Sequence, residues 1–136
     1  YYAHDGYSYG ILCNYKCEII VNGGTVTATG GNVTINKNQN SYSKANSYGI
    51  YGYLTVYGGT VTAICGTASY DSSRTPGRTP TTCAVASSYT SEKETVTLGE
   101  GITATASANA DGSDAVTYDA KKKDTYKYFK AEAATQ

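Results

Sequence analysis

Small apolar residues and threonine alternate in short runs along this chain. Residues 25–29 read TVTAT and residues 60–63 read TVTA, so that every second position is valine or alanine. A period of two is typical of a β-strand with one buried and one exposed face. Leucine is scarce and the chain holds a single Phe, which argues against a core of large side chains. We therefore expect many short strands, each burying a small aliphatic side chain.

The strand pattern recurs as an internal repeat. Residues 19–31 read IIVNGGTVTATGG and residues 54–66 read LTVYGGTVTAICG, which makes Gly23 and Gly58 equivalent at a period of 35 residues (58 − 23). A fainter copy, TVTLGEGITATAS, covers residues 95–107. Because neighbouring repeats bury residues that one repeat cannot bury alone, we expect a core ladder of three equivalent side chains, Val26, Val61 and Ile102.

A second repeated piece precedes the first two copies. SYGI occurs at residues 8–11 and 47–50, and four extra residues follow it in the first copy only. Each unit then reads as three short strands separated by turns, which is typical of one coil of a β-helix. The sequence predicts one all-β domain, a right-handed parallel β-helix (β-solenoid) of about four coils, at approximately 1–37, 38–75, 76–108 and 109–136.

These units resemble a known group of bacterial proteins. GILCNYKCEIIVNGGTVTATGG, GIYGYLTVYGGTVTA and VTLGEGITATAS are similar to the repeats of extracellular adhesin-like, carbohydrate-binding-domain-containing parallel β-helix proteins. The closing VTYDAKKKDTYKYFKA is similar to the end of such a repeat block. The resemblance implies a location outside the bacterial cell or on its surface, and it implies polysaccharide as one kind of partner.

The four cysteines are an even number, as in a secreted protein with two disulfides, and they lack the CxxC spacing of a metal site. Cys13 and Cys17 bracket the extra residues of the first repeat, and Cys65 and Cys83 flank a loop rich in Pro, Gly and Thr. We expect the disulfides Cys13–Cys17 and Cys65–Cys83, although four cysteines permit three pairings.

Charge and composition exclude several classes of function. The 11 basic and 11 acidic residues give zero formal net charge, which argues against non-specific binding of nucleic acid. No apolar run approaches the roughly 20 residues of a transmembrane helix. The chain has no Met and its first ten residues lack the features of a signal peptide, so we expect a processed product or a fragment. The single histidine, His4, lies near the start of the given sequence and gives no basis for arguing a Ser-His-Asp set, so we expect no enzyme activity.

Tyrosines are the candidate binding residues. Exposed rings bind the apolar faces of sugars or pack between subunits, but rings also simply cover strands, and the sequence leaves these three roles open. Six tyrosines gather around the two equivalent strand pairs: Tyr7, Tyr9, Tyr48, Tyr51, Tyr53 and Tyr57.

One acidic turn is a candidate calcium site. Asp111 and Asp114 flank a Gly-Ser pair, and carboxylate oxygens on a glycine turn can bind Ca²⁺. A solvated turn is the alternative, because the spacing does not match an EF-hand. No other cofactor is expected.

These observations together predict a non-catalytic extracellular structural or adhesive unit. A solenoid has unpaired strand edges at its ends, and neither end shows a helical cap, so we expect copies to assemble end to end into a fibre. The alternative is a carbohydrate-binding module of a bacterial surface protein. A polysaccharide lyase, which shares the β-helix architecture, and an ice-binding protein, which would use the outward threonines, come third.

Overall fold

The computed structural model describes residues 6–35, 44–70, 79–88 and 93–134. The strands are β1 (Gly6–Leu12), β2 (Glu18–Val21), β3 (Thr25–Thr29), β4 (Val33–Ile35), β5 (Ala45–Tyr51), β6 (Tyr53–Val56), β7 (Thr60–Ile64), β8 (Ala68–Tyr70), β9 (Thr81–Ala86), β10 (Val96–Leu98), β11 (Ile102–Ser107), β12 (Val116–Thr117) and β13 (Tyr128–Ala133). A short 3₁₀ helix, η1 (Ala120–Thr125), precedes β13.

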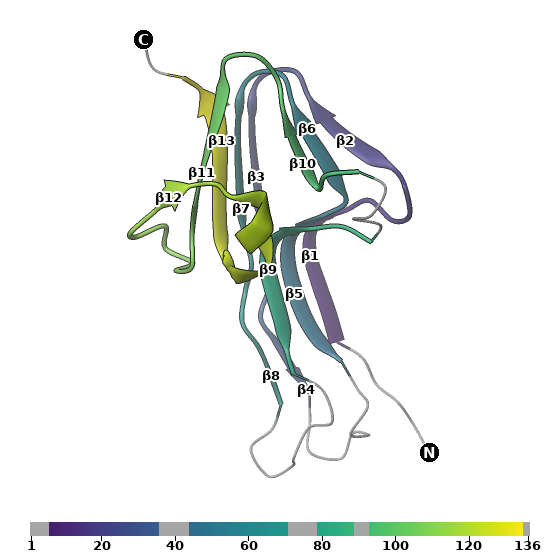
Figure 1. Cartoon of the computed structure of the whole chain (residues 1–136). Coiled ribbons are helices and arrows are strands. Elements are labelled where there is room, and N and C mark those ends of the chain that lie inside the picture. The colour runs from purple at the N-terminus through teal and green to yellow at the C-terminus, as the bar shows by residue number, and fades with distance from the viewer. Residues whose placement is uncertain (1–5, 36–43, 71–78, 89–92, 135–136) are drawn as a thin grey trace.

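The strands form four separate sheets (Figure 1). Their strand orders are β1-β5-β9, β10-β6-β2, β12-β11-β13-β7-β3 and β4-β8. The first, second and fourth sheets are parallel, and the five-stranded sheet mixes parallel with antiparallel pairs. The fold is therefore all-β but mixed in orientation.

The first two repeats lie side by side in parallel register. Ile11 pairs with Ile50 at an offset of 39 residues (50 − 11), and Val26 pairs with Val61 at an offset of 35 (61 − 26). The difference of four residues is taken up between β1 and β2, where the first repeat holds its extra residues. The repeat in the sequence thus corresponds to four parallel strand pairs: β1-β5, β2-β6, β3-β7 and β4-β8.

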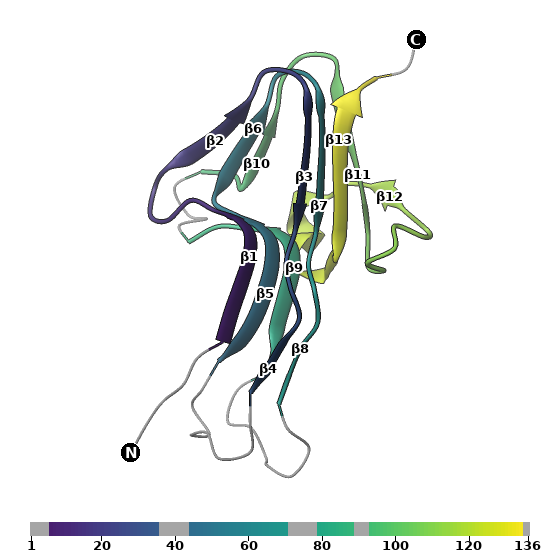
Figure 2. The same ribbon diagram turned by 180° about the vertical axis from the view of Figure 1, so that it is seen from behind.

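The expectation of a single right-handed parallel β-helix (β-solenoid) of about four coils is wrong. β13 runs antiparallel between β7 and β11, so that Val61 faces Ala131 and Ile102 faces Ala133 (Figure 2). Ile102 is therefore not adjacent to Val61, and the ladder predicted for Val26, Val61 and Ile102 is interrupted after two members. The sheets are small, differ in orientation and do not close.

The ring of Phe129 explains why β13 takes this place. Phe129 is 1% exposed, and its backbone neighbours across the sheet are Ala63 on β7 and Ala106 on β11. Two alanines leave room for one large ring, and a fully buried aromatic side chain contributes more than a further small residue at that position would. β13 thus contributes a large aromatic side chain to the core, whereas the repeats contribute mainly smaller aliphatic ones.

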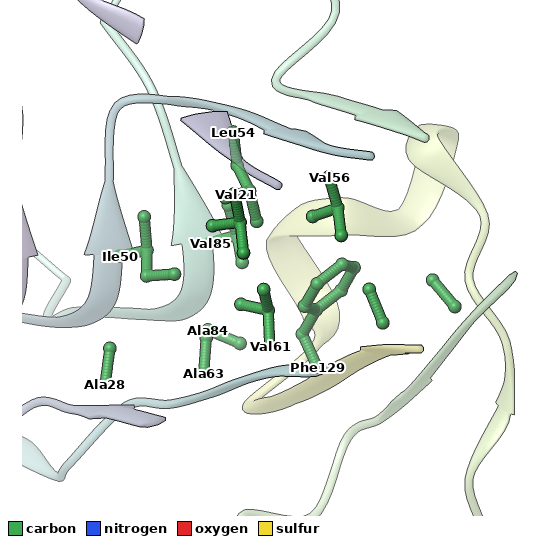
Figure 3. Close-up of a cluster of buried hydrophobic side chains, with 12 residues drawn as sticks. Val21, Ala28, Ile50, Leu54, Val56, Val61, Ala63, Ala84, Val85 and Phe129 are labelled. Atoms are coloured by element: carbon green, nitrogen blue, oxygen red, sulfur yellow. The ribbon is translucent and has the colours of Figure 1, made fainter. Parts of the chain in front are cut away.

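The main core lies between the sheets and combines aliphatic residues from the repeats with this ring (Figure 3). Its fully buried large side chains include Ile50, Leu54, Val56, Val61 and Phe129. A smaller cluster of Val33, Ile35 and Ala45 lies at the β4-β8 end. Several tyrosines lie on the other face of the β1-β5-β9 sheet, away from this core.

Candidate binding surface of clustered tyrosines

Three tyrosine rings stack along the outer face of the β1-β5 pair. Tyr9 and Tyr48 are paired in register, and Tyr7 lies two residues before Tyr9, on the same face of β1. The ring centroids of Tyr7 and Tyr9 are 6.2 Å apart with an interplanar angle of 7°. Those of Tyr9 and Tyr48 are 5.6 Å apart at 16°. The parallel register of the repeats therefore places the rings one above another.

Tyr51 completes this group. Its ring centroid lies 4.9 Å from that of Tyr48 and 5.6 Å from that of Tyr9, the latter in an edge-on arrangement. The Ser88 hydroxyl donates a hydrogen bond of 3.0 Å to the Tyr51 hydroxyl. We call Tyr7, Tyr9, Tyr48 and Tyr51 the tyrosine cluster.

Two hydroxyls of the tyrosine cluster, those of Tyr9 and Tyr48, have raised pKa values. Burial raises the pKa of Tyr9, and the neighbouring Tyr51 raises it further. Burial also raises the pKa of Tyr48, with smaller contributions from Cys83 and the other rings of the cluster. Both hydroxyls therefore stay protonated, each able to donate and accept hydrogen bonds. Tyr7 is 43% exposed, Tyr9 and Tyr51 are partly exposed, and Tyr48 is only 8% exposed, so the area open to a partner comes chiefly from Tyr7.

Two of the six predicted tyrosines lie elsewhere. Tyr53 is 3% exposed on β6, and the Lys93 ammonium lies 5.6 Å from its ring centroid. Tyr57 follows β6 and is largely exposed, in the turn opposite Gly99. The structure thus brings four of the six rings together. Ser88 also contacts the tyrosine cluster, and no pattern in the sequence predicted this contact.

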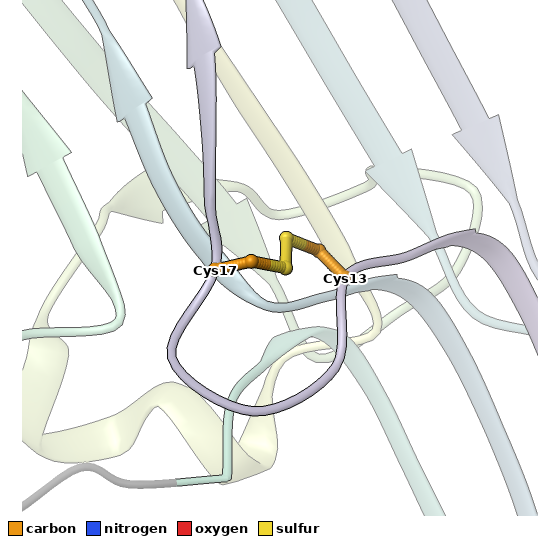
Figure 4. The surroundings of a disulfide bond; sticks show 2 residues. All are labelled: Cys13 and Cys17. Atoms are coloured by element: carbon orange, nitrogen blue, oxygen red, sulfur yellow. A yellow bond between two sulfur atoms is a disulfide. The ribbon is translucent and has the colours of Figure 1, made fainter.

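The disulfide between Cys13 and Cys17 is present and closes the loop between β1 and β2 (Figure 4). The two Cα atoms lie 5.7 Å apart, within the range that a disulfide can bridge. Tyr15, at the tip of this loop, has a positive φ of 61° and is strongly exposed.

The expected disulfide between Cys65 and Cys83 is not formed in the structure, where both residues are buried free thiols. Each thiol instead contacts a backbone carbonyl of the segment before β13: Cys65 Sγ lies 3.7 Å from Lys127 O, and Cys83 Sγ lies 3.7 Å from Asp124 O. Burial, aided by Asp124 and Cys65, raises the pKa of the Cys83 thiol to about 11. Burial also raises the pKa of Cys65. Both thiols are therefore protonated and unreactive near neutral pH.

The acidic turn uses one of its carboxylates locally. Asp111 Oδ1 accepts a 2.9 Å hydrogen bond from the Ser113 backbone N–H, and the hydrogen bonds of Ser113 lower the pKa of Asp111. Asp114 adopts a left-handed conformation with φ of 56°. Within the described ranges, no group of three or more His, Cys, Asp or Glu residues could hold a metal ion. The contacts of Asp111 are those of an ordinary turn.

The outward threonines do not form an unbroken array. Thr25 pairs with Thr60 and Thr27 with Thr62, but the next strand places Lys130 beside Thr62. Lys130 Nζ forms a 3.0 Å ion pair with Glu132 on the same strand. Charged residues of β13 therefore separate the threonines of the first two repeats from those of β11.

Comparisons with protein-family models, with curated proteins and with solved structures gave no match. In the part of the chain that the structure describes, no helix has the length and apolar character needed to cross a membrane. The tyrosine cluster is thus the surface feature on which a functional interpretation rests.

Proposed function

We propose that the chain is a non-catalytic extracellular structural or adhesive unit, and that the tyrosine cluster is its contact surface. The observation that carries this proposal is the gathering of four rings on one outer sheet face, at centroid distances of 4.9 to 6.2 Å. Tyrosine is favoured at protein interfaces because one ring supplies a large apolar area and a polar tip. A partner can therefore cover the apolar area of these rings and hydrogen-bond to their hydroxyls.

The extracellular setting has two supports. The repeat units resemble those of bacterial surface proteins, and the Cys13–Cys17 disulfide is of the kind that persists in oxidising compartments. We propose a bacterial cell surface or its surroundings as the location.

Copies of the chain are the proposed partner of the tyrosine cluster. Light scattering and negative-stain electron microscopy of the purified chain without ligand should show assemblies larger than a pair. Tyr7→Ser removes an exposed ring of the cluster and should reduce this assembly, whereas Tyr57→Ser removes an exposed ring outside the cluster and should not. Equal assembly by both variants would contradict the proposed role of the cluster.

The alternative is a carbohydrate-binding module, favoured by the nearly parallel rings of Tyr7 and Tyr9. Parallel aromatic rings can lie against the apolar face of a sugar ring. Because the chain contains no Trp, tyrosine fluorescence can report such binding directly. Saturable quenching by a polysaccharide, lost in Tyr7→Ser and kept in Tyr57→Ser, would establish this alternative; no change with any polysaccharide on a glycan array would exclude it.

A further inference from the structure

All four sheets end, on one side, at a strand of the first repeat, which we define as residues 6–35 with strands β1 to β4. Among the described residues, no strand pairs with the outer edge of any of these four strands. In Figure 2 each of them lies to the left of its second-repeat partner, so the unpaired edges face the same side of the molecule. We call this side the first-repeat edge.

The first-repeat edge lacks the usual protection of edge strands. Edge strands of natural proteins usually carry charged residues or proline, because their unpaired backbone N–H and C=O groups could otherwise pair with a strand of another molecule. The only charged residue within β1 to β4 is Glu18, and these strands contain no proline. The Glu18 carboxylate is turned toward the second repeat, where it accepts a 2.8 Å hydrogen bond from Thr55 Oγ1 and pairs with Lys93.

Exposed apolar side chains are concentrated beside this edge. Six large hydrophobic side chains are exposed in the described ranges, and four of them belong to the first repeat. Ile20 on β2 is 50% exposed. Burial of such side chains against a partner is favourable in proportion to their apolar area. The four are Tyr7, Leu12, Tyr15 and Ile20.

Gly23 gives an independent indication of a missing neighbour. Its equivalent Gly58 must be glycine because an added Cβ would lie 2.5 Å from the Asn22 carbonyl oxygen of the preceding repeat. A Cβ added to Gly23 would meet nothing within 4 Å, and Gly23 does not have the positive φ that favours glycine. Within the described structure Gly23 thus has no steric reason to be glycine, but it would have one if another backbone approached the first-repeat edge.

We propose that the first-repeat edge is the interface through which two copies of this chain pair about a two-fold axis. Both copies bring the same unpaired edges, and an isologous contact requires only that the surface be self-complementary. The first repeat contains one basic residue, Lys16, and one acidic residue, Glu18, so two copies meet without net repulsion.

On the opposite side of the molecule, one of the four sheets has its far edge covered. There the far edge of β9 is covered by the C-terminal segment, since Ala84 N–H donates a 2.9 Å hydrogen bond to Tyr126 O. Head-to-tail addition would require this cover to leave. Pairing of two first-repeat edges requires no rearrangement of the described residues.

This inference goes beyond the proposed function, because it concerns strand edges, and Tyr7 is the one side chain named for both surfaces. The tyrosine cluster covers the outer face of the β1-β5-β9 sheet, whereas pairing uses strand edges. Two distinct interfaces on one chain would allow pairs to join into larger assemblies, in agreement with the proposed structural role.

Sedimentation velocity of the full chain tests the pairing. At concentrations from about 1 to roughly 100 μM we expect the smallest assembly to be a species of twice 14.3 kDa, and this species should persist in Tyr7→Ser, in which the larger assemblies are reduced. Ile20→Lys places a charge beside the first-repeat edge, and Gly23→Val fills the space above it; each should weaken pairing at least tenfold. Val116→Lys is the matched control, because Val116 is 55% exposed on β12, away from this edge, and should leave pairing unchanged.

Circular dichroism and thermal melting of each variant establish that it is folded. Ile20→Lys and Gly23→Val act by different means, so the test stands if either one folds. A monomer over the whole concentration range would overturn the inference. So would a dimer that both edge variants retain, or one that Val116→Lys disrupts to the same extent. Loss of large assemblies in Tyr7→Ser with the dimer intact would agree with two separate interfaces.

Discussion

Replacing Phe129 by alanine tests the feature that distinguishes this fold from a plain stack of repeats. Phe129 is 1% exposed, lies between Ala63 and Ala106 on the adjacent strands, and contacts the Tyr118 ring edge-on at 5.2 Å. Neither alanine can fill the space that the ring would leave. Phe→Ala substitutions at such sites cost about 3–5 kcal/mol of unfolding free energy. That is a large share of the roughly 5–15 kcal/mol that stabilises a typical domain.

Urea unfolding followed by far-ultraviolet circular dichroism measures this loss. We expect the midpoint of Phe129→Ala to fall sharply, or the variant to be unfolded without urea. Glu132→Ala on the same strand is the control, because its ion pair with Lys130 is exposed and should contribute little to stability. If Phe129→Ala lost no more than its control, β13 would not be held in the centre of the sheet and the reasoning would be refuted.

Three further outcomes follow from the contacts. Gly58→Ala should lower the free energy of unfolding, measured in urea, by about 1–3 kcal/mol, because its Cβ would lie 2.5 Å from Asn22 O. Gly23→Ala should cost far less, since its Cβ would meet no atom within 4 Å. Equal losses in the two variants would contradict the close approach of Gly58 to the Asn22 carbonyl. Since burial raises the pKa of Cys83 to about 11, stability should be fully present below about pH 8.5 and fall as the pH rises toward 11; this fall should be smaller in Cys83→Ala. Cys13→Ser should lower stability by roughly 2 kcal/mol through loss of the small disulfide loop, and reductant should have the same effect on the unaltered chain but none on the variant.

The repeat motif predicted the arrangement of the first two repeats well. The shared Val, Gly and Thr positions at residues 19–31 and 54–66 place Val26 beside Val61, as the structure does. The four extra residues of the first copy are accommodated in the Cys13–Cys17 loop without disturbing either strand. Local alternation and glycine positions suffice here, because equivalent residues have equivalent neighbours.

The prediction from the third copy was wrong because β13 separates β11 from the second repeat, and the register of β10 also differs by one residue from the one expected. Matching Gly99 to Gly58 would place Leu98 opposite Tyr57, but the structure pairs Leu98 with Val56. The inward side chains of β11 still face the core, with Ala104 and Ala106 buried, but β11 pairs with β13 and not with the second repeat. The place of β13 depends on Phe129 fitting between distant alanines, which no local pattern reveals.

The tyrosine cluster was predictable only in part. Tyr9 and Tyr48 occupy the same position of the repeated SYGI piece, and parallel pairing brings them together. Tyr53 has the same side chain but lies on β6, where all four residues are buried, and it packs near Lys93 instead. Whether a tyrosine faces outward depends on what covers its sheet, and that is decided by distant segments.

The position of β13 has a consequence for the order of folding. This strand is the last in sequence among those described, yet it lies between β7 and β11, so the two parts of the five-stranded sheet stay unjoined until residues 128–133 are available. Until then, the edges of β7 and β11 that pair with β13 have no partner. Contacts this distant in sequence are typical of slow folding, with unpaired edges that aggregate if the last strand is delayed.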